Sequence, residues 1–276
     1  MRSVLDNSDI HAIKTGMLYD FATTKIVAET LQSCFKLGVT MPPLICDPVC
    51  ISTSGQTLLR QDAIESMITR LFPMAALITP NKTEAELLLA QRGISQKIET
   101  LDDMLIAAEL LLRSVGGGAV LLKGGHVTAT IRDVNILSAK KPDIQIIKHG
   151  LYGDNMEILL ASHQDYSQSE LMIDILHQAS GEKTLFVHPR IISSSTHGAR
   201  CTLSSAIACG IALGCKCKSH VEHFSFFDNA LIISVKEAVK KAIAYTHHGI
   251  EVAQPLGKGH GTIDHFHSIS LLLIPR

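Results

Sequence analysis

The sequence contains no tryptophan, and aromatic residues make up only 4% of its 276 positions. A core without large rings has to be built from aliphatic side chains, and 46% of the residues are hydrophobic. Charged residues account for only 18% of the chain, which argues against intrinsic disorder. Length and composition therefore predict one large folded α/β domain or two small ones.

An excess of positive charge is also missing. The 25 Lys and Arg residues are balanced by 26 Asp and Glu, which leaves a formal net charge of -1. No basic run with interleaved aromatic residues is present, so we expect no binding to nucleic acid. No apolar run approaches the roughly 18–20 residues of a membrane span, and no signal peptide opens the chain. These absences predict a cytoplasmic protein that binds no membrane.

The seven cysteines lack the spacing of a metal site. No CxxC pair occurs, and Cys215 and Cys217 are too close together for the usual zinc loop. We therefore expect most of the cysteines to be small buried hydrophobic residues in a reducing compartment.

Short apolar runs alternate with longer amphipathic ones along the chain. The short runs predict strands at 43–48, 75–81, 119–125, 144–149 and 183–189. The amphipathic runs predict helices at 57–72, 82–93, 101–116, 201–214 and about 229–248. This alternation indicates an α/β fold with a mostly parallel sheet and helices on both of its faces. Residues 150–182 are polar and poorly patterned, which predicts an insertion or flap within a domain that spans 1–276.

Polar residues lie at the ends of three of the predicted strands, at the edge where ligands bind in parallel sheets. Asp47 can hold Mg²⁺, although it could also be part of an Asp-Pro turn. Asn81 and Glu84 are three residues apart at a helix start and can order water bound to Mg²⁺, although Glu84 could simply favour the helix dipole. Lys123 precedes two glycines and can reach a nucleotide phosphate. Together with Thr79, these residues predict a ligand site.

The stretch "STHGARCTLSSAIACGIALG" (195–214) reads as a loop that turns into a helix, an arrangement typical of anion sites. Arg200 lies in this turn, where a residue as small as glycine is expected. We favour the interpretation that its side chain disrupts the turn, because a Cβ limits positive φ. In the alternative interpretation, the guanidinium itself binds phosphate.

Six segments carry a resemblance to a known family: "AIKTGML" (12–18), "CDPVCISTSG" (46–55), "LITPNKTEAELL" (77–88), "LLKGGH" (121–126), "STHGARCTLSSAIA" (195–208) and "LGKGHGTIDHFHSI" (256–269). Together they resemble the hydroxymethylpyrimidine/phosphomethylpyrimidine kinases of thiamine biosynthesis. Their sequences are most similar to those of the fungal members. The resemblance implies a ribokinase-like fold. It also implies ATP- and Mg²⁺-dependent phosphorylation of 4-amino-5-hydroxymethyl-2-methylpyrimidine and then of its monophosphate.

The family loop reads Gly-Thr-Gly-Cys, and its cysteine stands where related sugar kinases place a catalytic aspartate. This cysteine argues against a sugar or pyridoxal kinase. The resemblance implies roles for eleven residues: Cys201 as the base; Gly198, Ala199 and Arg200 as the anion hole; Lys123, Thr79 and Asn81 at the nucleotide phosphates; Glu84 and Asp47 at Mg²⁺; and Met17 and Val49 at the pyrimidine.

The chain departs from the family at its start. In the family a longer segment, with the first strand of the sheet, precedes the part matched by residues 12–18. We therefore expect a sheet without its first strand region. Together with Arg200, this departure keeps a second hypothesis open, in which a non-catalytic homologue binds nucleotide or a full-length partner. Whether the chain forms a homodimer is also left open.

Overall fold

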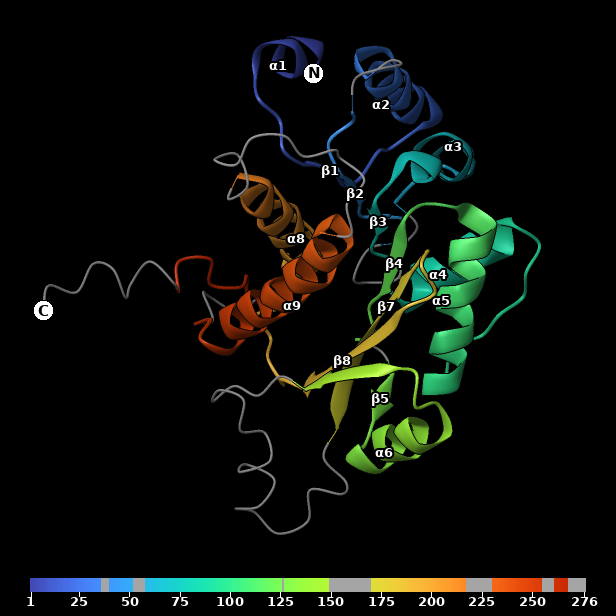
Figure 1. Ribbon diagram of the computed structural model, residues 1–276, viewed down its shortest axis with the longest axis vertical. Coiled ribbons are helices and arrows are strands. Elements are labelled where there is room, and N and C mark those ends of the chain that lie inside the picture. Colours follow the sequence, from blue (N-terminus) through green and yellow to red (C-terminus); the bar gives the residue numbers. More distant parts are fainter. Residues whose placement is uncertain are drawn as a thin grey trace, which may run out of the picture. The chain divides into compact units, whose positions relative to one another are not determined.

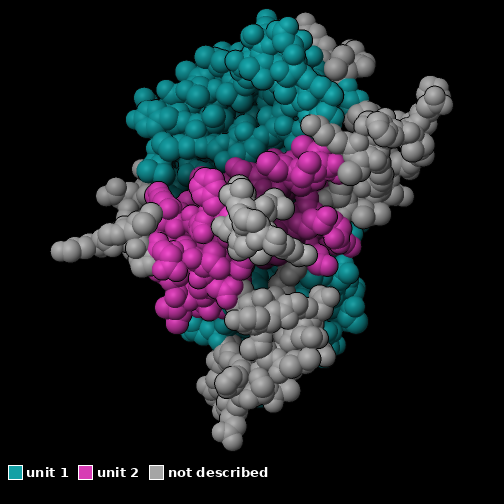
Figure 2. Space-filling model, turned by 90° about the vertical axis from the view of Figure 1, so that its left-hand side faces the viewer, with its two compact units in different colours: residues 1–189 teal, residues 190–276 magenta. Residues whose placement is uncertain are grey.

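The computed structural model describes residues 1–35, 40–51, 58–125, 127–148, 170–216, 230–254 and 261–267. The chain forms two compact units, Met1–Pro189 and Arg190–Arg276, which Figure 2 colours separately. Within the described ranges, no helix is both long enough and apolar enough to cross a membrane.

The first unit is built on an eight-stranded sheet (Figure 1). The strand order is β1-β2-β3-β4-β7-β8-β6, and β5 pairs with β7. Strands β1 to β4 are parallel, and β7 is antiparallel to both β4 and β8, so β8 and β6 run in the same direction as β4. The strands are β1 (Ile13–Thr15), β2 (Leu44–Cys46), β3 (Leu77–Ile78), β4 (Ala119–Leu122), β5 (Thr128–Ala129), β6 (Gln145–Lys148), β7 (Leu171–Gln178) and β8 (Lys183–Pro189). The mostly parallel sheet is confirmed.

Several helices begin where the sequence supplies a capping side chain. Asn81, Thr100 and Thr130 each form a capping box with an acidic residue three positions later. The helices of the first unit are α1 (Arg2–Asn7), α2 (Phe21–Cys34), α3 (Gln61–Ser66), α4 (Lys82–Gln91), α5 (Leu101–Val115) and α6 (Ile131–Lys140). A π-helical turn, Met67–Leu71, continues α3, and a 3₁₀ turn follows at Phe72–Met74. The second unit contains α8 (Ala199–Lys216) and α9 (Ala230–Glu251).

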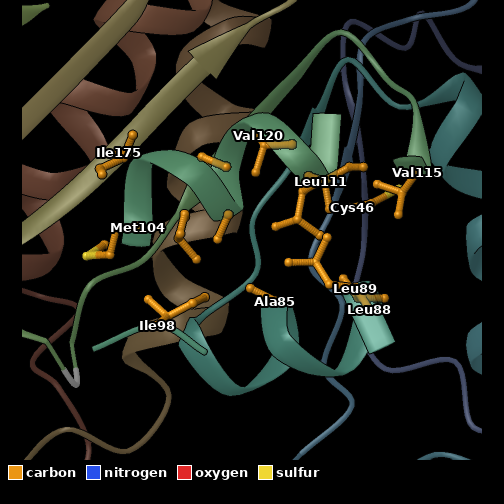
Figure 3. Packing of buried hydrophobic residues seen from close by; sticks show 14 of the residues in the cluster. Cys46, Ala85, Leu88, Leu89, Ile98, Met104, Leu111, Val115, Val120 and Ile175 are labelled. Carbon is orange, nitrogen blue, oxygen red and sulfur yellow. The ribbon is translucent and has the colours of Figure 1, made fainter. Parts of the chain in front are cut away.

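The core of the first unit is aliphatic, as the composition predicts. Leu88 and Leu89 of α4 and Leu111 of α5 belong to one buried cluster with Val120 of β4 and Ile175 of β7 (Figure 3). Because helices and strands contribute to the same cluster, burial of these side chains fixes the ends of β2, β3 and β4 relative to one another.

One boundary in the sequence interpretation was wrong. Residues 150–182 were predicted to be an insertion or flap, but Leu171–Gln178 forms β7, which lies between β4 and β8. The polar residues Asp174 and His177 interrupt its apolar run and hide the strand in the sequence. The rest of the predicted insertion up to residue 169 lies outside the described residues. Strands β1 and β5 and helices α1, α2 and α6 were also not predicted.

Candidate active site at the carboxyl edge of the sheet

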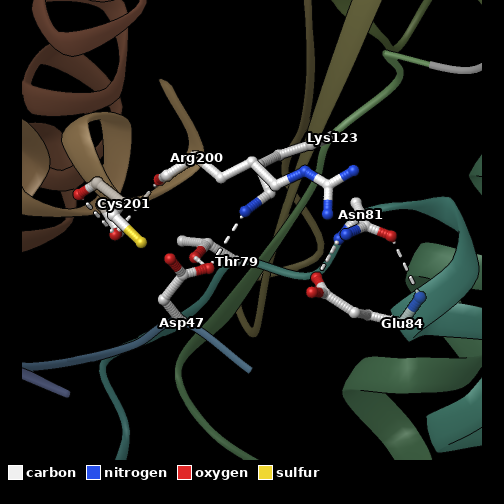
Figure 4. A network of polar contacts seen from close by, with 8 residues as sticks. Asp47, Thr79, Asn81, Glu84, Lys123, Arg200 and Cys201 are labelled. Carbon is white, nitrogen blue, oxygen red and sulfur yellow. Dashed lines mark hydrogen bonds and ion pairs between the residues drawn. The ribbon is translucent and has the colours of Figure 1, made fainter. Parts of the chain in front are cut away.

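Three neighbouring parallel strands each end at a polar residue of the candidate site. Asp47 follows β2, Lys123 follows β4, and Thr79 follows β3 between them. Lys123 Nζ and Thr79 Oγ1 both donate to Asp47 Oδ1, each at 3.0 Å (Figure 4). The side chains of Lys123 and Asp47 are only 8% and 1% exposed. The strand order therefore brings Lys123 and Asp47 together as a buried ion pair. The Thr79 hydroxyl donates to the same oxygen of Asp47.

Asn81 and Glu84 form the capping box of α4. Asn81 Oδ1 accepts the Glu84 backbone N–H at 3.1 Å, and Glu84 Oε2 accepts the Asn81 backbone N–H at 2.9 Å. Glu84 therefore has a structural role at the start of α4, where it caps the helix. Asn81 Nδ2 is buried and has no hydrogen-bond partner in the described part of the chain. A buried amide donor without an acceptor is costly, and this one is available to a ligand.

The turn after β4 packs tightly against β7. A Cβ at Gly124 would lie 1.8 Å from the backbone oxygen of Ile173, so only glycine fits there. The Lys123 backbone N–H donates to Pro80 O at 2.9 Å, and Lys123 forms an isolated parallel bridge with Asn81. Of the two glycines that follow Lys123, it is therefore Gly124 that cannot carry a side chain.

Two buried cysteines, Cys46 and Cys50, lie near the carboxylates. Burial raises the pKa of the Cys50 thiol to about 12, and the charges of Glu84 and Asp47 act in the same direction. Burial also raises the pKa of Cys46 to about 12. Both residues are buried, but Cys34 is half-buried and Cys201 and Cys209 are exposed, so the expectation that most of the cysteines are buried is wrong for the described ones.

The two residues implied for the pyrimidine lie in loops at the same edge. Met17 follows β1 and Val49 follows β2, and the two strands are parallel neighbours. The Asp47 backbone N–H donates to Thr15 O at 3.0 Å, which ties the two loops together. Met17 is 48% exposed and Val49 is half-buried, so neither is an ordinary core residue.

The remaining predicted residues lie at the start of α8 in the second unit. Gly198 has a φ of 85°, and the helix begins at the next residue, Ala199. Arg200 and Cys201 therefore lie in the first helical turn. The expectation that a side chain at 200 strains the backbone is wrong, because helical dihedrals suit any L-residue and the positive φ falls on Gly198.

Hydrogen bonds within the second unit hold the loop before α8. His197 N donates to Gly261 O at 3.1 Å, and Gly261 N donates to Ser194 O at 3.1 Å. Thr202 donates through both its backbone nitrogen and its hydroxyl to Gly198 O, each at 2.9 Å. The start of α8 is thus anchored from both sides.

A buried pair near the Lys123 turn was missed by sequence reasoning. Asp174 of β7 and His188 of β8 lie 3.3 Å apart, Oδ2 to Nε2, with side chains only 7% and 5% exposed. The available signal was a charged residue inside the otherwise apolar run "LMIDIL".

Solved structures that share this fold include small-molecule kinases. The chain matches the solved phosphomethylpyrimidine kinase of Clostridium difficile with a TM-score of 0.55 and 26% identity, over 90% of this chain and 73% of that one. An ADP complex of Bacillus subtilis pyridoxal kinase matches with a TM-score of 0.63 and 22% identity, over 98% of this chain and 76% of that one, which shows the same ribokinase-like fold.

Residues 1–151 and 141–264 match the family described as phosphomethylpyrimidine kinase, and the chain belongs to this family. It is 32% identical to a hydroxymethylpyrimidine/phosphomethylpyrimidine kinase of Streptomyces coelicolor over 264 residues, 96% of this chain and 71% of that protein. It is 30% identical to the thiamine biosynthesis bifunctional protein ThiED of Geobacter sulfurreducens, over 95% of this chain but only 39% of that longer protein.

Proposed function

We propose that the chain transfers the γ-phosphoryl group of ATP to 4-amino-5-hydroxymethyl-2-methylpyrimidine, and then a second phosphoryl group to the monophosphate. Membership of the family and the names of the relatives support the substrate class. The observation that carries the proposal is the buried Lys123–Asp47 pair at the carboxyl edge. Burying two charges rarely adds stability, so a pair placed where ligands bind in such sheets is best explained by function.

Lys123 and Asn81 are assigned to the nucleotide phosphates. The Lys123 ammonium can give charge-assisted hydrogen bonds to phosphate oxygens, and it already lies at the sheet edge on Asp47. Asn81 Nδ2 is a buried donor whose partner would be an acceptor on the ligand. Both residues meet at the parallel bridge between 81 and 123.

The carboxylates of Asp47 and Glu84 fit a magnesium ion that arrives with the nucleotide. No group of three or more His, Cys, Asp or Glu side chains is arranged as a metal site in the described ranges. Magnesium in kinases is usually held by one or two carboxylates together with phosphates and water, and these two buried carboxylates match that donor set. When bound, the ion would neutralise charge on the phosphate oxygens.

Cys201 is assigned as the base. Its thiolate would accept the proton of the substrate hydroxyl, while the hydroxyl oxygen forms a bond to the γ-phosphorus and ADP leaves. Cys201 lies in the first turn of α8, where the helix dipole has its positive end. We assign Gly198, Ala199 and Arg200 to the developing phosphoryl charge, and Met17 and Val49 to the pyrimidine ring.

The experiment measures ADP formation with MgATP and the pyrimidine alcohol, and nucleotide affinity by titration calorimetry. Cys201→Ser should lower the transfer rate about 10²–10⁴-fold, because a base is lost, while the affinity for MgATP stays within about twofold. Cys209→Ser is the matched control, since it changes another exposed cysteine of α8 and should leave both values unchanged. Undiminished transfer by Cys201→Ser would contradict the assignment. A parent chain that binds MgATP without transfer would instead support the non-catalytic hypothesis.

A further inference from the structure

Asp174 and His188 form a buried polar pair on neighbouring strands. Asp174 lies on β7 between Ile173 and Ile175, which both belong to the hydrophobic cluster. Because side chains alternate along a strand, Asp174 points to the opposite face of the sheet. His188 pairs with Met172 in the β7–β8 register, so it is a diagonal neighbour of Asp174 on that face.

The Asp174 carboxylate uses its two oxygens for two different partners. Oδ1 accepts the backbone N–H of Gly124 at 2.9 Å, and Oδ2 accepts from His188 Nε2 at 3.3 Å. The first bond crosses from β7 to the turn that carries Lys123. The second bond orients the carboxylate from β8.

Further contacts, besides the bond to Asp174, restrict the Lys123–Gly124 turn. On one side the Lys123 N–H is bound to Pro80 O, and on the other Gly124 lies too close to Ile173 O to carry a Cβ. Gly124 O accepts the Val127 N–H at 2.8 Å. A side chain of β7, that of Asp174, holds the Gly124 N–H of this turn.

We infer that Asp174, oriented by His188, is a positioning residue that aims the Lys123 ammonium at the nucleotide phosphate. This inference rests on the proposed function. An aliphatic side chain would suit β7 at least as well as a buried carboxylate does, since the next residue on the same face is Leu176. The charge at 174 is explained by the Gly124 N–H, to which the Asp174 carboxylate supplies an acceptor at 2.9 Å.

The test has two readouts on the folded chain, amide hydrogen exchange of Gly124 without ligand and the dissociation constant for MgATP. Asp174→Ala should speed exchange of Gly124 at least tenfold and weaken MgATP about tenfold or more, because a charge-assisted hydrogen bond is lost. Asp174→Asn keeps an acceptor oxygen and should restore MgATP affinity to within about threefold of the parent. Affinity for the pyrimidine alcohol should stay within about twofold in both variants.

Gln178→Ala is the matched control. Gln178 is also a buried polar residue of β7, but it lies at the opposite end, where its amide donates to Glu182. This variant should leave both readouts unchanged. If Asp174→Ala does not fold, His188→Ala takes its place, with Gly124 exchange and MgATP dissociation constant each expected to rise at least threefold.

The outcomes separate the two proposals. Unchanged Gly124 exchange, or unchanged MgATP affinity, in folded Asp174→Ala would overturn the positioning role. A parent chain without measurable affinity for MgATP would overturn the proposed function itself, whatever the exchange data show.

Discussion

Two lysine–carboxylate pairs of equal length occupy opposite edges of the same sheet. Lys123–Asp47 and Lys183–Glu109 both span 3.0 Å, but the side chains are 8% and 1% exposed in the first pair and 25% and 33% exposed in the second. Lys123 follows the end of β4, whereas Lys183 begins β8, which runs in the same direction. Equal distances therefore conceal different energetics, because water screens the second pair and hardly reaches the first.

The partners of the two pairs differ in the same way. Asp47 also accepts the buried Thr79 hydroxyl, whereas Glu109 also pairs with the exposed Arg113 on its own helix, at 2.7 Å. The first pair brings together the ends of three strands, and the second joins helix α5 to a strand. The comparison teaches that the buried pair is costly to dismantle, whereas the exposed pair is a replaceable surface contact.

The largest expected difference is in stability. Lys123→Met should lower the free energy of unfolding by about 3–5 kcal/mol, because it leaves the Asp47 carboxylate buried without its cation. Lys183→Met should cost at most about 1 kcal/mol, since its pair is partly solvated. Urea denaturation followed by circular dichroism measures both. Equal losses of unfolding free energy in Lys123→Met and Lys183→Met would contradict the comparison.

Adding Asp47→Asn to Lys123→Met should recover about 2 kcal/mol or more of the unfolding free energy, because the unpaired charge is then gone.

A smaller loss is expected at the third member of the buried network. Thr79→Val keeps the shape of the side chain but removes the hydroxyl that donates to Asp47, and it should cost about 1.5–3 kcal/mol of unfolding free energy. Thr30→Val is the control, because the hydroxyl of Thr30 bonds to a backbone oxygen on an exposed helix face. That change should stay within about 0.5 kcal/mol. A Thr79 variant as stable as the control would show that the hydroxyl contributes nothing.

At the start of α8 the expected effect is up to about 1 kcal/mol. Because Arg200 lies in a helical turn, Arg200→Ala should be more stable than Arg200→Gly by that amount, measured by thermal unfolding. Glycine at 200 should also give no faster phosphoryl transfer than alanine. A higher rate for Arg200→Gly than for Arg200→Ala would restore the interpretation that the backbone here requires glycine.

The smallest effect concerns pH at the exposed pair. The hydrogen bond from Lys183 lowers the pKa of Glu109, so the folded state favours the carboxylate. This contribution is fully present above the ordinary pKa of glutamate, about 4.3, and is lost as pH falls through the lower folded value. The stability difference between the parent and Lys183→Met should therefore be constant near pH 7 and disappear at acid pH. A difference that grows as pH falls would contradict the assignment.

The clustering of polar side chains at the sheet edge could be predicted because it depends on local signals. Each of Asp47, Thr79 and Lys123 directly follows a short apolar run, and parallel strands bring such positions to one edge. The role of Asn81 could not be decided from sequence, because the same residue serves a capping box and still presents a buried donor.

The errors have physical causes. Strand β7 was missed because Asp174 lies within its apolar run, and the reason for that charge is a hydrogen bond to Gly124, fifty positions earlier in the chain. Arg200 was placed in a strained turn because the sequence does not show which residue takes the positive φ. The structure assigns that φ to Gly198, two residues earlier.

The most direct test of the account is a calorimetric titration with MgATP of the parent, Lys123→Met and Lys183→Met, each first shown to be folded by thermal melting. We predict that Lys183→Met binds within about twofold of the parent, whereas Lys123→Met binds at least about a hundredfold more weakly, because a desolvated charge-assisted contact to phosphate is lost. Parent-like affinity in Lys123→Met would contradict the claim that the buried pair at the carboxyl edge is the nucleotide site.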